Sequence, residues 1–260
     1  MQHGPLRNAY LDALGIDRWV RRDAPAEPVY EAPASPAAPV GAPSRPSTQK
    51  VASAAAEAVP VPPRVREPLG PISDWGVLRE LVAACTACDL CKTRTQTVFG
   101  VGDTRAEWLI IGEAPGGEED RQGEPFVGRA GQLLNAMLLA IGLPRETVFI
   151  ANILKCRPPG NRDPKPEEVS NCLPFLSAQI ALLKPKMMLA VGRIAAQNLL
   201  ATDAPLARLR GKLHHFGEAN TPLVITYHPA YLLRTPSDKR KAWEDLKFAR
   251  ATYQRIVGTN

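Results

Sequence analysis

The sequence predicts an α/β protein, with a three-layer α/β/α domain built around a central four-stranded parallel sheet. Four short apolar runs, at 108–111, 147–151, 187–191 and 223–227, are typical of strands that are buried on both faces. Stretches in which apolar residues recur at helical spacing separate these runs. Strands that alternate with helices favour a parallel sheet with helices on both of its faces.

The ends of the predicted helices carry residues that suit a helix terminus. Ser73 can accept a hydrogen bond as the N-cap of the first helix, which runs to about Ala84. Pro166 suits the first turn of the long central helix, because an N–H group there would have no partner within the helix. The predicted helices cover about 74–84, 131–141, 166–183, 193–200 and 239–256.

A stretch rich in proline and alanine divides the chain. Residues 24–71 hold 12 of the 26 prolines, and so few aromatic residues that burial cannot offset the entropy of ordering the segment. We therefore expect a disordered linker there. Residues 1–23 carry apolar side chains at roughly helical spacing, which predicts a short amphipathic helix for docking on a protein partner. Residues 72–260 predict one domain of ordinary size, which we expect to be a monomer.

The charge and hydropathy of the chain exclude some classes of protein. The net charge of +6 and the pI of about 9.2 favour an acidic partner such as nucleic acid. No apolar run approaches the roughly 20 residues that span a bilayer. The first residues lack the charged and apolar regions of a signal peptide. We therefore expect a cytoplasmic protein without a membrane segment.

Five cysteines in a chain without a secretion signal favour metal ligation over disulfides. Three of them form the run Cys85-x-x-Cys88-x-x-Cys91, and Cys156 and Cys172 follow later in the chain. Cys85 and Cys88 have the spacing at which two thiolates can bind one metal centre. The alternative is that the cysteines are buried as small apolar residues. The spacing leaves open whether the metal is zinc or iron, and whether Cys91 is a ligand.

Polar residues follow three of the four predicted strands, namely Glu113, Asn152 and His228. In an open parallel sheet, ligands bind beyond the carboxyl ends of the strands, so these residues indicate a binding site. Taken singly, each could instead be a helix-terminal charge, a turn residue or a core histidine. The glycine-rich stretch at 112–120 is not a phosphate loop, because it lacks the Gly-Lys-Ser/Thr ending and its four acidic residues would repel phosphate.

Four motifs resemble those of a known enzyme family. They are GEAPGGEED at 112–120, GEPFVG at 123–128, ANILKCRP at 151–158 and HPAYLLR at 228–234. Together with the cysteine spacing, they resemble the family-four uracil-DNA glycosylases, the iron–sulfur branch of their superfamily, over about 74–249. The resemblance implies the fold of that superfamily. It also implies an enzyme that flips uracil out of single- or double-stranded DNA and hydrolyses its N-glycosidic bond, which starts base excision repair of deaminated cytosine.

The resemblance implies a cofactor and a base pocket. A [4Fe–4S] cluster would be held by Cys85, Cys88, Cys156 and Cys172, which leaves Cys91 free. Phe126 would stack on the uracil, and Glu119 would fill the space beside C5 in which a thymine methyl group would lie. The rest of the pocket lining, with the attacking water, would come from Gly112, Glu113 and Ala114.

Three residues would carry the catalysis that the resemblance implies. Asn152 would bind the Watson–Crick edge of the base, and His228 would face its O2 atom. Glu113 is the nearest carboxylate for activating water, because Ala114 stands where the best-known uracil glycosylases carry an aspartate. An alternative is that the leaving group and the DNA phosphates supply most of the catalysis.

Basic and apolar residues near these motifs predict contacts with DNA. Arginines would bind phosphates without reading the sequence, and an apolar wedge would enter the duplex as the base leaves. The expected contact residues are Arg157, Arg162, Tyr231, Leu232 and Arg234. Two alternatives to the glycosylase are a relative that traps uracil covalently and a non-catalytic nucleic-acid-binding module with a structural iron–sulfur cluster. The first is disfavoured because residues 157–171 are short and contain no histidine.

Overall fold

The computed structural model of the protein describes residue 70 and residues 72–258. The predicted N-terminal helix at 1–23 and nearly all of the predicted linker at 24–71 lie outside the described residues. No helix in the part that is described is long and apolar enough to cross a membrane.

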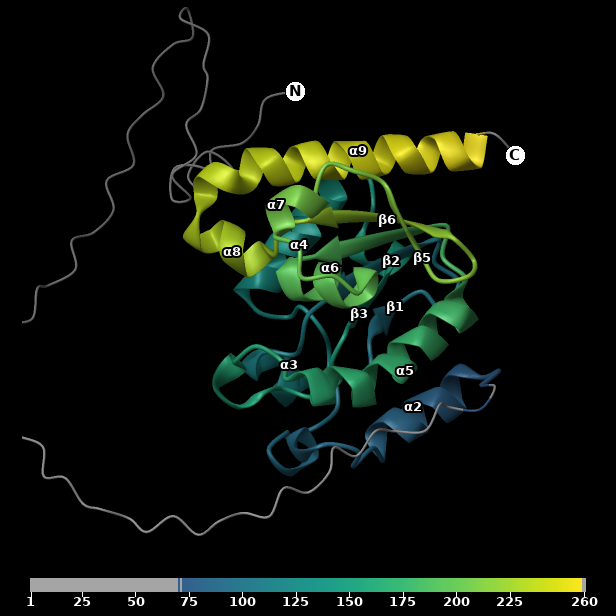
Figure 1. The fold of residues 1–260 in the computed structure, drawn as a ribbon, viewed down its shortest axis with the longest axis vertical. Helices are drawn as coiled ribbons and strands as arrows, with labels where there is room; N and C mark the ends of the chain where they lie inside the picture. The colour runs from purple at the N-terminus through teal and green to yellow at the C-terminus, as the bar shows by residue number, and fades with distance from the viewer. Residues whose placement is uncertain (1–69, 71, 259–260) are drawn as a thin grey trace, which may run out of the picture. The chain divides into compact units, whose positions relative to one another are not determined.

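A six-stranded sheet forms the centre of the domain, in the order β1-β3-β2-β4-β6-β5 (Figure 1). The four middle strands are parallel and correspond to the four predicted strands. The sheet is nevertheless wider than predicted, because β1 and β5 pair antiparallel with β3 and β6 at its two edges. The strands are β1 (Val101–Gly102), β2 (Trp108–Gly112), β3 (Phe149–Asn152), β4 (Met187–Val191), β5 (His214–Phe216) and β6 (Thr221–Thr226).

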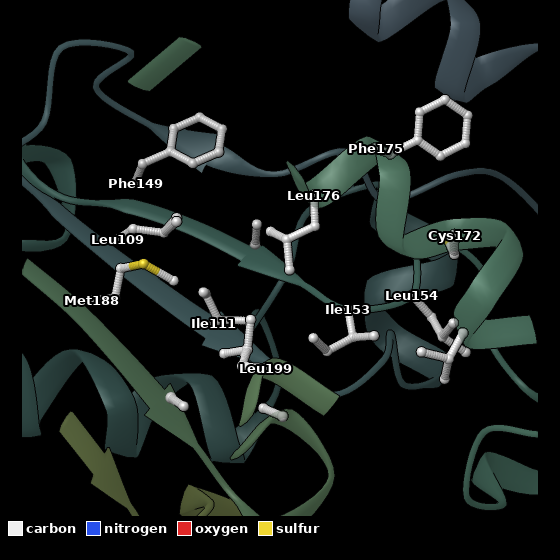
Figure 2. Packing of buried hydrophobic residues seen from close by; sticks show 14 of the residues in the cluster. Leu109, Ile111, Phe149, Ile153, Leu154, Cys172, Phe175, Leu176, Met188 and Leu199 are labelled. Atoms are coloured by element: carbon white, nitrogen blue, oxygen red, sulfur yellow. The ribbon is translucent and has the colours of Figure 1, made fainter. Parts of the chain in front are cut away.

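Helices cover both faces of the sheet, which confirms the three-layer prediction. Alternate residues of each middle strand belong to two separate apolar clusters, as the alternation of side chains along a strand requires. One cluster packs the sheet against α2, α5, α6 and α7, and the other packs it against α4, α8 and α9 (Figure 1). Figure 2 shows the first cluster, in which Leu109, Ile111 and Met188 of the strands lie opposite Leu176 of α5.

Five helices match the predicted ones closely, whereas the short helices α3, α7 and α8 do not appear in the prediction. The helix α5 and the strand β4 have the predicted bounds. Asp74, and not Ser73, caps α2, because its Oδ1 atom accepts a hydrogen bond from the Val77 N–H group at 3.0 Å. The helices are α2 (Trp75–Ala83), α3 (Gly117–Gln122), α4 (Arg129–Ala140), α5 (Pro166–Leu183), α6 (Arg193–Leu200), α7 (Leu206–Leu209), α8 (Pro229–Arg234) and α9 (Lys239–Gly258).

Candidate active site and candidate metal centre

A cleft opens at the carboxyl ends of the four parallel strands. Glu113 follows β2, Asn152 ends β3, Arg193 follows β4 and Gly192, and His228 follows β6 after one residue. The cleft therefore lies at the edge of the sheet that the strand order designates for a ligand. The residues that line it include Glu113, Ala114, Glu119, Phe126, Asn152, Arg162, Asp163, Arg193, Tyr227, His228, Tyr231 and Arg234.

Asn152 carries a buried acceptor without a partner. The residue is 2% exposed, and among the described residues its side-chain Oδ1 atom has no hydrogen-bond donor. A buried polar atom of this kind is costly unless a ligand satisfies it. Its backbone is held firmly, because the Lys155 ammonium donates to the Asn152 carbonyl at 2.8 Å and to Gln179 Oε1 at 2.7 Å.

Gly112 lets two side chains approach the end of β2. A Cβ atom at this position would lie 2.3 Å from Asn152 Oδ1 and 2.6 Å from the Phe126 ring. Any larger residue would therefore displace both groups. Gly112 itself does not line the cleft, so its role is to leave room for the side chains that do.

Phe126 lies on the cleft with an unusual backbone. Its φ angle is +55°, in the left-handed region that aromatic residues rarely adopt. The ring is 7% exposed, and its centroid lies 5.6 Å from the His228 ring at an interplanar angle of 31°. The two rings thus share one part of the cleft, where a flat ligand could contact both.

The hydrogen bonding of His228 identifies its proton-bearing nitrogen. The Ala230 N–H group donates to His228 Nδ1 at 3.1 Å, so the neutral ring carries its hydrogen on Nε2. Burial, together with the nearby Arg234 guanidinium, lowers the pKa of His228 to about 4. The ring is therefore a neutral donor at pH 7. It packs against Gly192, where a Cβ atom would lie 3.0 Å from that of His228.

Glu113 has the raised pKa expected of a carboxyl group in a partly closed cleft. Burial raises its pKa to about 7, the Asp163 carboxylate adds to this effect, and the Arg193 guanidinium opposes it. Asp163 and Arg193 pair with each other at 2.6 Å. Near pH 7, Glu113 is thus divided between its acid and its base forms, as suits a general base.

Glu119 lies at the cleft and also supports its wall. Its Oε1 atom accepts hydrogen bonds from the Val127 N–H group at 3.1 Å and from the Gly128 N–H group at 3.3 Å. The residue belongs to α3, which is not among the helices that the sequence predicts. The carboxylate therefore holds the segment that follows Phe126.

Some of the residues predicted to contact DNA line the cleft, whereas others already bind side chains of the protein itself. Arg234 and Tyr231 line the cleft, although the Tyr231 hydroxyl also donates to Asp238 at 2.6 Å. Arg162 lines it as well, but both ends of its guanidinium bind the Glu168 carboxylate, at 2.5 and 2.9 Å. Arg157 binds Asn161 at 2.7 Å and does not line the cleft.

The expectation that Leu232 contacts DNA is contradicted. Leu232 is 1% exposed and packs in the core with α4 and α9, because α8 turns this side of the motif inward. Its neighbour Leu233 is 36% exposed. In this helix, Leu233 is therefore the leucine at the surface.

Several cleft residues escaped the sequence reasoning. Gly192 and Arg193 follow β4 just as Glu113 follows β2, so the rule about carboxyl ends could have identified them. Tyr227 was predicted to end a strand, but it lies beyond β6 and stacks on Tyr231 at 5.1 Å. That contact depends on α8, which the sequence pattern does not reveal.

A separate pocket brings all five cysteines together. It is lined by Cys85, Cys88 and Cys91 from the loop after α2, by Cys156 after β3, and by Cys172 of α5. Two sulfur atoms accept hydrogen bonds at 3.1 Å: Cys172 Sγ from the Lys155 backbone N–H group, and Cys156 Sγ from the Arg94 guanidinium. Burial raises the pKa of Cys172 to about 12 and that of Cys88 to about 11.

The thiols surround the pocket without meeting at one point. Within residues 70 and 72–258, no three His, Cys, Asp or Glu side chains are arranged to hold a single metal ion. A tetrahedral zinc site needs four sulfur atoms within about 2.3 Å of one centre. Cysteine thiolates also hold iron–sulfur clusters, in which each iron takes one of them, so the all-sulfur donor set around this pocket is chemically suited to such a cluster as well as to zinc.

Comparison with known proteins adds an independent finding. Residues 99–247 match the family model described as the uracil DNA glycosylase superfamily. The chain is 44% identical over 177 residues to a type-4 uracil-DNA glycosylase of Archaeoglobus fulgidus, a match that covers 66% of this chain and 88% of that protein. Type-4 uracil-DNA glycosylases of Pyrobaculum aerophilum and Thermotoga maritima are 43% and 40% identical, over 66% and 67% of this chain and 91% and 92% of their own lengths.

Proposed function

Because this chain belongs to the type-4 branch of the uracil DNA glycosylase superfamily, we propose that it removes uracil from DNA by hydrolysing the bond between base and deoxyribose. This reaction starts the base excision repair of deaminated cytosine. The observation that carries the proposal is the unpaired Oδ1 atom of Asn152, buried beside Phe126 and Gly112 at the carboxyl edge of the sheet.

Recognition of uracil would use the side chains that converge on this atom. A base inside a duplex is out of reach, so it must be flipped into the cleft. Phe126 would stack on its face, the Asn152 Oδ1 atom would accept the N3–H group, and the Asn152 amide would donate to O4. Cytosine presents an acceptor at N3 and an amino donor at the O4 position, so the same amide would be mismatched at both.

Cleavage would depend on stabilising the leaving base. As the glycosidic bond breaks, the sugar acquires positive charge and the uracil acquires negative charge. His228 would donate its Nε2–H group to O2, where that negative charge develops. A neutral histidine suits this role, because its burial beside Arg234 disfavours a second positive charge.

Water would be activated at the end of β2. We propose Glu113 as the base, since its pKa of about 7 allows it to accept a proton at neutral pH. Ala114, which also lines the cleft, leaves space beside it for the water molecule.

Glu119 would exclude thymine. Its carboxylate lines the cleft and is fixed by the N–H groups of Val127 and Gly128. A fixed group beside C5 would clash with the methyl group that distinguishes thymine from uracil.

The DNA backbone would lie across the mouth of the cleft. Arg234 is exposed at its edge and suits a phosphate contact, and Tyr231 lies beside it. We propose Leu233 as the apolar side chain that enters the stack, and we assign Arg157 and Arg162 to supporting the phosphate contacts from the loop after Cys156. Both single-stranded and double-stranded DNA could bind in this way.

The cysteine pocket would hold a [4Fe–4S] cluster. Cys85, Cys88, Cys156 and Cys172 would be its ligands, with Cys91 left over. The cluster would tie the loop after α2 to β3 and α5 when bound. The Arg94 and Lys155 N–H groups already face two of the sulfur atoms and would stabilise their negative charge.

The organisation of the whole chain remains a proposal as well. We propose that residues 72–260 act as a monomeric cytoplasmic glycosylase domain. Residues 1–23 would form a helix that binds a protein partner, and residues 24–71 would form a flexible tether.

One assay tests the activity against the two alternatives. The protein is incubated with a labelled single-stranded oligonucleotide that contains one uracil, and the product is treated with alkali. We expect strand cleavage at the uracil position and none in a matched oligonucleotide with cytosine. A slow-migrating adduct would instead indicate covalent trapping, and an unchanged band would indicate a non-catalytic binding module.

A further inference from the structure

Phe126 holds its place on the cleft in spite of its own backbone preference. A φ of +55° is strained for an aromatic residue, so neighbouring groups must hold it there. The ring contact with His228 depends on this conformation, because a return to an ordinary φ would turn the side chain away from its present position. What holds the backbone at Phe126 therefore also positions the ring.

Arg145 binds two successive backbone carbonyl groups, that of Phe126 and that of the residue before it. Its guanidinium donates to the Pro125 carbonyl at 2.6 Å and to the Phe126 carbonyl at 3.3 Å. A third hydrogen bond, to Asn135 Oδ1 at 3.1 Å, ties it to α4. Arg145 lies in the turn Arg145–Thr147 just before β3, far from Phe126 in sequence and outside the cleft lining.

Arg145 is a partly buried cation whose hydrogen-bond partners are neutral groups. Burial lowers the pKa of its guanidinium, an effect that the Glu124 carboxylate opposes. No carboxylate lies within 4.0 Å of it among the described residues. Its hydrogen-bond partners are neutral oxygens, which offset the desolvation of a cation less than a directly paired carboxylate would. Two different nitrogens of its planar guanidinium, Nη2 and Nη1, bind the two successive carbonyl groups, and a single lysine ammonium does not reproduce this rigid geometry.

The backbone on the two sides of Phe126 is thus bound by two residues, one that precedes Phe126 in the chain and one that follows it. After Phe126, the N–H groups of Val127 and Gly128 donate to the Glu119 carboxylate. Before and at Phe126, Arg145 donates to the carbonyl groups of Pro125 and Phe126. Gly131 of α4 packs so closely on the Phe126 carbonyl that a Cβ atom there would lie 1.8 Å from the oxygen. Glu119 also lines the cleft, whereas Arg145 does not.

We propose that Arg145 is a positioning residue for catalysis, which acts by holding the Phe126 ring in the orientation that stacks on the flipped base. This inference rests on the proposed function, since the stacking role belongs to it. Arg145 itself would touch neither DNA nor base. Its loss would act through Phe126 alone, and this requirement separates positioning from general stabilisation.

The kinetic test is a double-mutant cycle between Arg145→Met and Phe126→Ala. Single-turnover excision of uracil is measured for each variant and for the pair, after circular dichroism has established that each is folded. We expect Arg145→Met to lower the rate by about 10²-fold, as misplacement by about 1 Å can do. In the Phe126→Ala background, the same substitution should cost almost nothing further. Independent, multiplying losses would overturn the proposal.

Two matched variants sharpen the cycle. Arg145→Lys keeps the positive charge and N–H donors but loses the planar fork, so it should recover part of the rate. It also serves as the test if the methionine variant does not fold. Arg105→Met removes an exposed arginine near the opposite end of β2 and should excise at the wild-type rate. An Arg145→Lys variant that is as fast as wild type, or as slow as Arg145→Met, would contradict the two-carbonyl grip.

A second readout does not depend on activity. In protein with labelled phenylalanine and histidine, nuclear Overhauser contacts between the Phe126 and His228 rings report the position of the ring. These contacts should be present in wild type and in Arg105→Met, and lost in folded Arg145→Met. Persistence of the contacts in Arg145→Met would overturn the inference. Failure of the wild type to excise uracil would overturn the proposed function alone, because the ring contacts would still decide the role of Arg145.

Discussion

Asn152 and His228 carry the polar atoms on which binding and departure of the base would depend. Replacing either by alanine removes one preorganised hydrogen-bonding group, a change that costs about 10²–10³ in rate in other enzymes. We expect Asn152→Ala and His228→Ala each to lower single-turnover excision by that factor while melting near the wild-type temperature. Near wild-type rates in both variants would show that the base binds elsewhere.

Glu113 would set the pH dependence of the reaction. A base must be ionised to accept a proton, and the pKa of Glu113 is raised to about 7. Excision should therefore rise with pH through about 7 and fall below it. His228, with a pKa of about 4, stays neutral over this range and should add no second limb. Rates from pH 5 to 9 test this, and Glu113→Gln should lower the rate and abolish the limb. A limb that survives the substitution would exclude Glu113 as the base.

Glu119 combines selectivity with support, so its test needs a matched variant. Glu119→Gly would open the space beside C5 and should permit weak release of thymine from a mismatched duplex. It would also free the Val127 and Gly128 N–H groups. Glu119→Gln keeps the side-chain volume and one acceptor oxygen, and should continue to reject thymine. If the glycine variant excises uracil but still rejects thymine, then selectivity arises elsewhere.

Sequence reasoning reached the side chains of the site but not the groups that place them. Asn152, Phe126 and His228 stand in motifs whose resemblance is visible in the chain, and all three line the cleft. The supporting roles of Arg145 and Lys155 depend on contacts across 20 and 24 residues, to Pro125 and Gln179, which no local pattern encodes. The burial of Leu232 depends on how α8 packs against α4 and α9. A helix as short as α8 shows no periodic pattern of apolar residues from which this packing could be predicted.

At the scale of elements, length decides what the sequence reveals. The strand β4 and the helix α5 match their predictions because an unbroken apolar run and eighteen helical residues leave little ambiguity. The edge strands β1 and β5 hold two and three residues, too few for any alternation to be visible. They exist because β3 and β6 offer them hydrogen bonds, which is a property of the assembled sheet.

The cysteine pocket joins three elements, and its ligands can be distinguished by substitution. Cys156 lies after β3 and Cys172 lies within α5, so a cluster held by both would close large loops. We expect Cys156→Ser and Cys172→Ser to lose iron and brown colour and to melt at a lower temperature. Cys91→Ser should keep four irons per chain and full activity. Iron and absorbance are measured on anaerobically purified protein. Iron loss in Cys91→Ser with retention in Cys172→Ser would reverse the assignment, and zinc in place of iron would reject the cluster.

At the scale of the whole molecule, the domain assignment predicts that residues 72–260 suffice for the chemistry. The family match at 99–247 and the cleft both lie inside this range. A chain that begins at Ile72 should excise uracil from an oligonucleotide at the full-length rate and melt at the same temperature. A large drop in either measurement would show that residues 1–71 belong to the folded domain and do not serve a separate partner.

The strand order also governs the route by which the chain folds. Each parallel pair among β3, β2, β4 and β6 must wait for a helical crossover to close, and such non-local contacts form slowly. The antiparallel pair β5 and β6 is joined by four residues, so this hairpin can form within about 1–10 μs. It lies late in the sequence, whereas the central strand β2 lies early. On the ribosome, β2 would therefore emerge long before its second neighbour β4, and we expect the nascent chain to remain open until the last third of the protein has been made.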